Sequence, residues 1–396
     1  MNLSFKTPMA VSKLQRRESE LPEVRPDDDI SANLQHVSWD FRESQTGADL
    51  HSIHPYPARF IPEIPRALIN AIGIPAGTAV FDPFCGAGTT LAEAQSLGYE
   101  TIGIDLNPIA CLISRVKTTL LPERFVAVAM DCVLAAQTKT GVPIPQIPNL
   151  DHWFSPEPQD AIASLLSAFQ DYEEPSELQD HLRVALSSIL VRVSHQDSDT
   201  RYAAIPRSVS RADVFNLFLA SCSRIATAKT HFGPSAPATV LQHDVLSVPR
   251  SAIKTPIGLV ITSPPYPNAY EYWLYHKYRM WWLGFDPIAV KAREIGARPH
   301  FFKTSPATEE DFAVQMRTVL RLLCEVVVPG GSVCFVVGRS KIHGKDVDNG
   351  ALITDAAREL GMRSVFSAER TIAAHRKSFN LSHARIKTES VLVFRV

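Results

Sequence analysis

Two polar segments, each directly after an apolar run, contain the residue types that could do chemistry. The first is DPFCGAGTT (82–90), which lies between a β-rich run and a helix-like run. Its two glycines let the backbone pass close to a ligand, and the free amides at the start of the helix can hold an anionic group. Asp105 ends the next β-rich run, where a carboxylate can accept both ribose hydroxyls of an adenosine-type ligand.

This glycine turn is compatible with more than one ligand. A nicotinamide dinucleotide site would carry a third glycine, but Leu91 occupies that position. Asp82 lies where a carboxylate would face the ligand, which suits a positively charged amino acid end better than a pyrophosphate. A tight turn that binds nothing is the remaining alternative.

The second segment is TSPPY (262–266), which follows an apolar strand predicted at 257–261. It therefore lies at the carboxyl end of a strand, where open α/β sheets bind their ligands. Because proline has no amide donor, the double proline makes a rigid loop whose carbonyls are free to accept hydrogen bonds. Together with Ser263 they can orient the hydrogens of an exocyclic amino group, and Tyr266 can stack on a base outside its duplex. A purely structural turn is the alternative.

The elements that must position these segments alternate between strand and helix. Strands at 78–84 and 100–106 are each followed by a helix, at 89–97 and 107–117, which is typical of a parallel sheet covered by helices. Further strands are predicted at 238–245, 257–261 and 332–337, further helices at 311–326 and 351–360, and an antiparallel pair at 363–372 and 389–396. We therefore expect an α/β fold with a mostly parallel sheet and an antiparallel C-terminal strand pair.

Three regions differ in composition. Residues 1–48 are polar with little periodicity, so they predict a loosely ordered tail with a short helix near 14–21. Residues 49–120 and 236–396 form the predicted α/β domain. Residues 121–235 predict a mainly helical insertion, with helical periodicity at 161–172, 177–193 and 212–228.

Composition excludes several classes of protein. Among 396 residues, 40 Lys and Arg face 41 Asp and Glu, so any nucleic-acid surface must be a local patch rather than a basic coat. No apolar run approaches the roughly 20 residues that span a bilayer, and the first residues do not resemble a secretory leader. The six cysteines have no metal-like spacing, so they predict reduced thiols in a cytoplasmic protein. The polar loop 194–201 has ligand-type side chains but no partner cluster, and we expect no metal site.

In this order, DPFCGAGTT and TSPPY resemble the S-adenosylmethionine-dependent amino methyltransferases that act on nucleic acids. Serine before the two prolines is most similar to the N4-cytosine DNA methyltransferases, and HPYPARFIP (54–62) resembles the family's cofactor-binding N-terminal motif. The resemblance covers about 51–118 and 238–396. It implies a Rossmann-like class I methyltransferase fold, S-adenosyl-L-methionine as the cofactor and double-stranded DNA as the partner. A cognate restriction endonuclease would be a further partner of such an enzyme.

The resemblance also assigns roles to single residues. It implies a catalytic set that holds the target base, formed by Ser263, Pro264, Pro265 and Tyr266. It implies a cofactor site formed by Tyr56, Phe60, Asp82, Pro83, Phe84, Gly86, Gly88, Thr89, Thr90, Asp105, Asn107 and Asp244, with the last at the adenine. In the implied direct methyl transfer, serine is too weak a base to act first, so the amino proton leaves afterwards to water or a nearby acceptor.

The same residues also bear on other classes of protein. The C5-cytosine enzymes need a cysteine nucleophile, normally beside proline, whereas the chain has no Pro-Cys pair and Cys85 lies within the glycine turn. The N6-adenine enzymes share the mechanism and the RNA amino methyltransferases share the double proline, so both stay open. A non-enzymatic binding protein on the same fold is disfavoured because both segments are intact.

Candidate DNA contacts lie in three places. Aromatic and basic residues interleave at 270–285, which predicts either a packed amphipathic helix or DNA contacts by Tyr272, His276, Lys277 or Arg279. Lys and Arg outnumber Asp and Glu at 276–303 and 363–395, so these segments could contact phosphates. The insertion is expected to close over DNA and to supply base-edge contacts from Arg192, Arg201, Arg207 and Arg211.

Overall fold

The computed structural model describes residues 26–41, 50–172, 176–199, 201, 203–230, 232–233, 235–268, 270–372 and 388–396. Its central feature is a seven-stranded sheet in the order β3-β2-β1-β4-β5-β9-β8. The strands are β1 (Ala79–Asp82), β2 (Thr101–Asp105), β3 (Ala238–Gln242), β4 (Ile257–Thr262), β5 (Val327–Gly338), β8 (Arg363–Thr371) and β9 (Thr388–Arg395). A separate hairpin pairs β6 (Ser340–Ile342) with β7 (Lys345–Val347).

The strand directions confirm the predicted fold class, a Rossmann-like class I methyltransferase sheet. Strands β3, β2, β1, β4 and β5 are parallel to one another, whereas β9 is antiparallel to both of its neighbours, β5 and β8. The chain moves outward from β1 to β3 and then returns to β4 on the other side of β1. Such a reversal opens a crevice at the carboxyl ends of the strands, and open α/β sheets bind ligands there.

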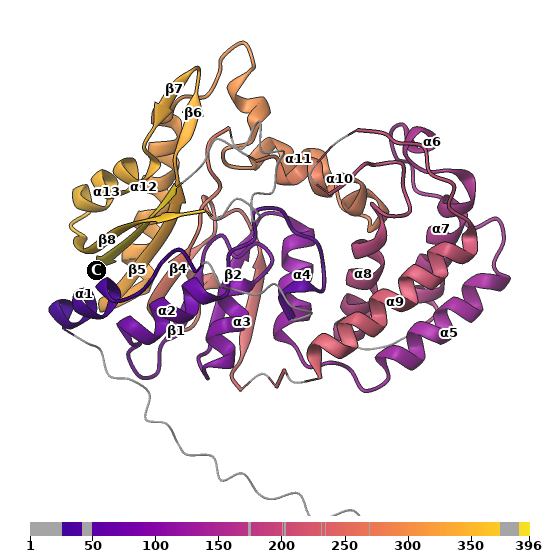
Figure 1. Ribbon diagram of the computed structural model, residues 1–396, viewed down its shortest axis with the longest axis horizontal. Coiled ribbons are helices and arrows are strands. Elements are labelled where there is room, and N and C mark those ends of the chain that lie inside the picture. The colour runs from indigo at the N-terminus through magenta and orange to yellow at the C-terminus, as the bar shows by residue number, and fades with distance from the viewer. Residues whose placement is uncertain are drawn as a thin grey trace, which may run out of the picture.

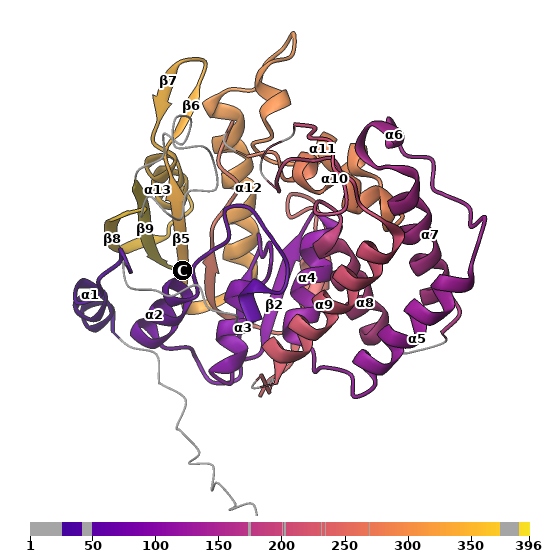
Figure 2. The same cartoon turned by 45° about the vertical axis from the view of Figure 1, so that its right-hand side comes forward.

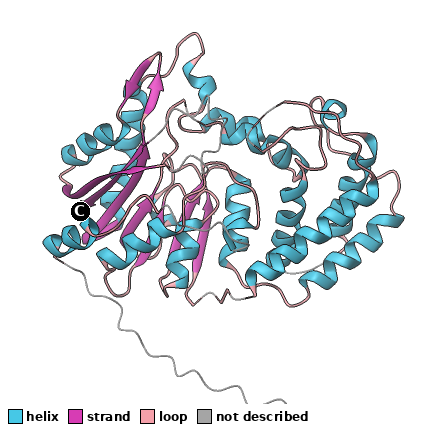
Figure 3. Ribbon diagram, viewed as in Figure 1, coloured by secondary structure: helices cyan, strands magenta, loops and turns pink. Residues whose placement is uncertain are grey.

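Helices cover both faces of the sheet (Figures 1 and 3). Val80 points to an apolar core shared with α1 (Asp27–Gln35), α2 (Glu63–Ile72) and α3 (Thr89–Ser96). Its neighbour Phe81 points to the opposite core, shared with α12 (Glu309–Val326) and α13 (Asn349–Glu359). This alternation follows from the two-residue period of a strand, and burial on both faces explains why β1 is continuously apolar before Asp82.

A helical body lies beside the β3 edge of the sheet (Figures 1 and 2). It contains α5 (Phe125–Thr138), α6 (Leu150–Trp153), α7 (Pro156–Gln170), α8 (Ser176–Ile189) and α9 (Arg211–Lys229). The structure places α7, α8 and α9 where the periodicity predicts helices, and it adds α5 and α6. The apolar core of this body includes Leu112 and Val116 of α4 (Pro108–Thr118) and Tyr278 and Trp282 of α10 (Tyr272–Trp282). With α11 (Pro287–Arg293), α10 lies across the top of the fold between the two bodies.

The prediction of a loosely ordered tail is wrong for residues 26–41. Helix α1 buries Ile30 and Leu34 completely, and Trp39 is 6% exposed in the same apolar core. Asp27 at its start pairs with Arg363 and Arg395 of the C-terminal strands. Only two apolar side chains of the helix face the core, so the mostly polar sequence has no clear helical pattern. The helix expected near 14–21 lies outside the described residues.

Nothing in the described part of the chain forms a helix long and apolar enough to cross a membrane.

The packing of α1 can be tested by its stability contribution. Leu34→Ala should lower the free energy of unfolding by about 2–5 kcal/mol, because it opens a cavity in a closed core. Gln35→Ala, at the exposed neighbouring position, should change it by no more than about 0.5 kcal/mol. Urea unfolding followed by circular dichroism measures both. Equal, small effects would mean that α1 is not part of the folded core.

Candidate functional site

The glycine turn joins β1 to α3 by two residues in the left-handed region. Gly86 has φ 48° and Gly88 has φ 72°, and Gly88 is the N-cap residue of α3. A Cβ on Gly88 would lie 2.7 Å from Ser114 Oγ, so glycine lets the turn pack directly on α4. Ser114 Oγ in turn donates a hydrogen bond to the Gly86 carbonyl, 2.7 Å away.

Asp105 fixes the turn from the end of β2. Its Oδ2 accepts from the Gly86 amide at 2.9 Å, and its Oδ1 accepts from the Asn107 amide at 2.8 Å. Asn107 then caps α4, since its Oδ1 accepts from the Ile109 amide. Burial raises the pKa of Asp105 to about 6, although these backbone donors oppose the shift.

Asp82 connects the turn to the TSPPY loop. It is the last residue of β1, and its Oδ1 accepts from Thr262 Oγ1 at 2.6 Å and from the Phe84 amide at 3.1 Å. Thr262 is the last residue of β4 and directly precedes Ser263. Burial raises the pKa of Asp82 to about 6. One carboxylate therefore joins the two segments that the sequence analysis singles out.

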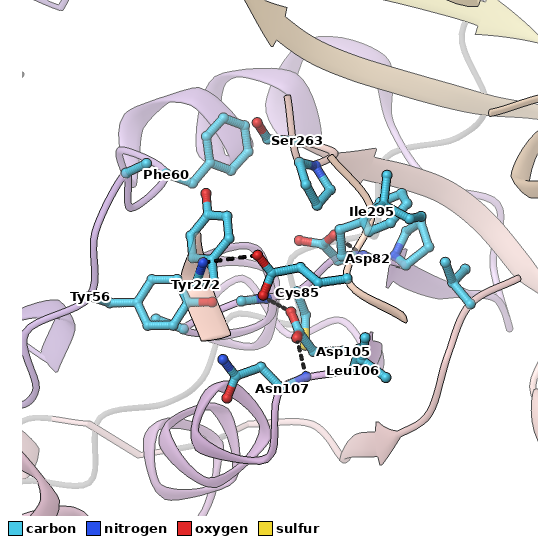
Figure 4. Close-up of a pocket in the computed structure, with 18 of the residues that line it drawn as sticks. Tyr56, Phe60, Asp82, Cys85, Asp105, Leu106, Asn107, Ser263, Tyr272 and Ile295 are labelled. Atoms are coloured by element: carbon cyan, nitrogen blue, oxygen red, sulfur yellow. Dashed lines mark hydrogen bonds between the residues drawn. The ribbon is translucent and has the colours of Figure 1, made fainter. Parts of the chain in front are cut away.

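These segments line one cavity, which measures about 930 Å³ with its open mouth (Figure 4). Tyr56 and Tyr272 lie along one side, and Asp82 and Ile295 lie across from them. Most of the predicted residues line it, namely Tyr56, Phe60, Asp82, Pro83, Phe84, Gly86, Thr89, Thr90, Asp105, Asn107, Asp244, Ser263 and Pro265. Gly88, Pro264 and Tyr266 are not in the lining.

An aromatic stack lies along the side of the cavity that faces Asp82. The Tyr56 ring stacks on Tyr272 with centroids 5.7 Å apart and on His276 with centroids 5.1 Å apart. A Cβ on Gly86 would meet the Tyr56 ring at 3.4 Å, so the HPYPARFIP segment packs closely on the glycine turn. Tyr272, predicted only as a DNA contact, is therefore a lining residue of this cavity.

The sequence analysis missed Glu294, which follows α11 and lines the cavity. Its two oxygens accept from the backbone amides of Tyr272 at 3.0 Å and Trp273 at 2.7 Å, which caps the start of α10. Burial raises its pKa to about 8, and Asp105 adds to the shift. No local motif marks this glutamate, because its partners lie about 20 residues earlier in the chain.

The TSPPY loop differs in part from the expectation. Ser263 lines the cavity, whereas the Tyr266 ring is 8% exposed and belongs to the apolar core between the sheet and α12. The Tyr266 hydroxyl lies 3.4 Å from Ser263 Oγ and donates to Glu389 Oε1 at 2.8 Å. The ring is not part of the cavity lining, so its stacking role stays a prediction.

Several predicted DNA contacts are internal instead. On α10, His276 is fully buried and Arg279 is 1% exposed, and Arg279 pairs with Asp199, so the interpretation as a packed helix holds for them. Arg207 donates to three backbone carbonyls of the 191–197 segment, which holds that loop together.

Of the remaining arginines predicted to contact DNA, some are in ion pairs and others are exposed. Arg211 pairs with Asp160, whereas Arg192 is exposed and Arg201 is largely exposed. In the C-terminal basic segment, 373–387 lies outside the described residues, and the flanking arginines Arg363, Arg370 and Arg395 are all engaged in ion pairs.

The described residues also bear on two other kinds of site, a metal centre and a cysteine nucleophile. They contain no group of three His, Cys, Asp or Glu that could hold a metal ion. In the polar loop, His195 contacts Ser155 Oγ at 3.0 Å, and Asp199 is the partner of Arg279. Burial raises the pKa of the Cys85 thiol well above its ordinary value, which is unfavourable for a nucleophile.

The donor set of the cavity fits a cationic adenosine-type cofactor. Asp82 and Glu294 are buried carboxylates and Asp105 is a half-buried one, and a positive charge or ribose hydroxyls would compensate them. Asn107 Nδ2 is buried and has no hydrogen-bond partner among the described residues, so it is a donor left over for a ligand.

Glu294 should make the stability of the protein depend on pH. Its pKa rises from 4.5 to about 8 on folding, so between these values the folded state holds a proton that the unfolded chain has lost. The free energy of unfolding should therefore fall as pH rises through this window, by up to about 1.4 kcal/mol per pH unit. Glu294→Gln should lack this fall with pH, so its free energy of unfolding should rise relative to that of the wild type between pH 5 and 8.

Urea unfolding at a series of pH values measures this difference. Glu123→Gln, which removes an exposed carboxyl group, is the control and should parallel the wild type. If the free energy of unfolding of Glu294→Gln had the same pH dependence as that of the wild type, Glu294 would titrate in the folded protein as an ordinary glutamate.

Comparisons with known proteins agree with this geometry. A family model described as DNA methylase matches residues 8–115, which include HPYPARFIP and the glycine turn. Its match begins well before residue 51, where the expected resemblance starts, so the N-terminal segment also has the family's pattern.

Three curated relatives match parts of the chain. The type II methyltransferase M.MvaI of Kocuria varians is 24% identical over 60% of this chain and 57% of its own length. The type II methyltransferase M.MjaII of Methanocaldococcus jannaschii is 36% identical over 20% of this chain and 16% of its own length. A tRNA (guanine(10)-N2)-dimethyltransferase of Methanothermobacter thermautotrophicus is 38% identical over 13% of this chain and 16% of its own length. The chain thus spans less than two thirds of each relative.

The sheet order, the shared cavity and the family match point in the same direction. Residues 8–115 are similar to the DNA methylase family, and the sheet is of the class I methyltransferase type, which uses S-adenosyl-L-methionine as the cofactor.

Proposed function

We propose that the protein transfers a methyl group from S-adenosyl-L-methionine to the exocyclic N4 of a cytosine that has left its DNA duplex. The observation that carries the proposal is the hydrogen bond between Thr262 and Asp82, which joins the TSPPY loop to the glycine turn in one cavity. The serine before the two prolines favours cytosine over adenine. Membership of a restriction–modification pair follows by analogy with the type II relatives.

In this proposal the acidic wall of the cavity holds the cofactor. Asp105 accepts the ribose hydroxyls, Asp244 contacts the adenine, and the buried carboxylates beside them balance the positive charge. When bound, S-adenosylmethionine supplies the methyl group as a sulfonium electrophile. The aromatic stack around Tyr56 shields that region from water, which strengthens the electrostatic interactions inside it.

The cofactor role of Asp105 predicts a change in affinity. Asp105→Asn should weaken S-adenosylmethionine binding at least tenfold, since it removes charge-assisted hydrogen bonds worth roughly 1.5–3 kcal/mol each. Asp286→Asn, a change at the N-cap of α11 that retains a capping side chain, should leave the affinity unchanged. Isothermal titration calorimetry measures both, with NAD as a ligand expected not to bind. Unchanged affinity in a folded Asp105→Asn protein would remove Asp105 from the ribose site.

At the other end of the cavity, Ser263 and the Pro264 carbonyl would hold the amino group of the target base. An exocyclic amino nitrogen is a poor nucleophile because its lone pair is delocalised into the ring. Two fixed acceptors would turn its hydrogens away and direct the lone pair to the methyl group, so the protein would act through position and charge complementarity.

Removal of one acceptor should slow transfer and leave the cofactor bound. Ser263→Ala should lower turnover by about 10²–10³-fold, the usual cost of losing one preorganised partner, with S-adenosylmethionine affinity unchanged. Ser305→Ala, in an exposed loop, is the control. The assay uses tritiated cofactor and duplex DNA, with an RNA sample in parallel, and nucleoside analysis of the product. Wild-type turnover in Ser263→Ala would contradict the role of the loop.

The same assay separates the candidate substrates. N4-methylcytosine supports the proposal, N6-methyladenine would assign the chain to the adenine enzymes, and label in RNA alone would replace DNA as the substrate. The RNA arm is included because of the short tRNA dimethyltransferase match.

DNA recognition is assigned in this proposal to the helical region 121–235, and catalysis to the regions 49–120 and 236–396. Arg192 and Arg201 are its exposed candidates, because Arg207 and Arg211 are bonded internally. Arg293, exposed at the cavity lining, and the exposed Arg298 and Lys303 that follow it would contact phosphates.

A further inference from the structure

Behind Ser263, three side chains form a hydrogen-bonded row that leads away from the cavity. Ser263 lines the cavity, the Tyr266 hydroxyl lies 3.4 Å behind its Oγ, and Glu389 Oε1 accepts from that hydroxyl at 2.8 Å. Glu389 lies on β9, and its other oxygen pairs with Arg370 of β8. The row thus begins at the proposed amino site and ends at a carboxylate on the antiparallel part of the sheet.

The surroundings hold this row in one arrangement. Arg370 is 5% exposed in its side chain and also donates to the Trp39 carbonyl at 3.0 Å, so it fixes the Glu389 carboxylate from behind. The backbone carbonyl of Tyr266 lies 2.8 Å from where a Cβ on Gly296 would be, so the 294–296 segment packs on the loop. Asn268 also donates its amide to the Gly296 carbonyl at 2.9 Å. The Tyr266 hydroxyl is thereby kept between its two partners.

We propose that Ser263, Tyr266 and Glu389 form a proton path that removes the proton released when the target amino group is methylated. The inference rests on the proposed function. The amino nitrogen must lose one proton for each methyl group that it gains, because its lone pair forms the new N–C bond while the methyl–sulfur bond breaks and leaves its electron pair on sulfur. As the N–C bond forms, the amino proton passes to Ser263 Oγ, the serine proton passes to Tyr266 Oη, and the tyrosine proton passes to Glu389 Oε1, so the path acts within the methyl-transfer step.

The balance of this step needs no further reactant. Serine and tyrosine each receive one proton and give one, so both end neutral as they began, and one carboxylate becomes a carboxylic acid. Burial raises the pKa of Tyr266 well above its ordinary value, which keeps the hydroxyl protonated and able to pass a proton on. The Glu389 side chain is 15% exposed, so it can return its proton to water before the next turnover.

The path assigns Tyr266 a role through its hydroxyl, whereas a stacking platform would act through its ring. Tyr266→Phe separates the two, because it keeps the ring and removes only the hydroxyl. We expect Tyr266→Phe to slow single-turnover methylation of duplex DNA about 100-fold or more, close to Tyr266→Ala, since positioned proton transfer contributes at least that factor. Tyr266→Phe with wild-type activity beside a crippled Tyr266→Ala would overturn the path and restore the stacking role.

Glu389 is tested as a positioning residue that acts through Tyr266. Glu389→Gln should slow transfer similarly, Glu389→Asp should recover part of the rate, and the Tyr266→Phe/Glu389→Gln pair should be no slower than either change alone. Glu369→Gln, an exposed position on β8, is the matched control. Multiplied effects in the double variant would mean two separate roles and would overturn the path. Tyr266→Phe keeps the test valid if the Arg370 pair makes Glu389→Gln unstable.

Two further measurements distinguish proton transfer from structural damage. Single-turnover transfer by the wild type should be slower in D₂O than in H₂O, and this difference should disappear in Tyr266→Phe. Cofactor affinity and the fluorescence of 2-aminopurine at the target position should stay at wild-type values in Tyr266→Phe, because binding and base extrusion do not use the hydroxyl. Loss of either would overturn the path as the cause of the slow rate. A wild-type protein that methylates neither DNA nor RNA would overturn the proposed function itself, and the path with it.

Discussion

The site depends on one requirement: the carboxylates at the ends of two parallel strands need hydrogen-bond donors. A carboxylate that is removed from water must find donors in the protein, and at the ends of β1 and β2 the available donors are nearby backbone amides. Asp105 accepts one amide from the glycine turn, at Gly86, and one from Asn107 at the start of α4, and so determines where the turn lies relative to α4. The requirement to satisfy this charge therefore shapes the backbone of the cavity as well as its electrostatic character.

The two halves of the sheet contribute different chemistry. The parallel half, β3 to β5, places acidic and polar groups at strand ends around one cavity. The antiparallel strands β9 and β8 place an ion pair behind the TSPPY loop, on the side away from the cofactor groups. Within the parallel half, a 2.6 Å hydrogen bond joins Thr262 at the end of β4 to Asp82 at the end of β1, at the crevice where the strand order reverses.

Local patterns predicted most of the strands and helices, and most of the residues that they singled out line the cavity. Glycines, strand ends and the Asn107-Pro108 helix start are local signals, and the structure places them in one cavity as expected. The misses involve partners that are distant in sequence. Glu294 lines the cavity and caps α10, whose start lies 22 residues earlier, and the Tyr266 hydroxyl bonds to Glu389, which lies 123 residues later. Helix α1 was not predicted because two buried side chains among polar ones make too weak a helical pattern.

Strand β9 has a consequence for the synthesis of the protein. It follows every other strand in the sequence, yet it lies inside the sheet between β5 and β8. A nascent chain that has not yet supplied β9 leaves the long strand β5 with an open edge and Arg370 without its anionic partner. The cofactor wall can assemble from the earlier strands during translation, but the row behind Ser263 cannot. Under the proposed function, a growing chain would therefore assemble the cofactor groups before the row behind Ser263, so methyl transfer would wait for β9.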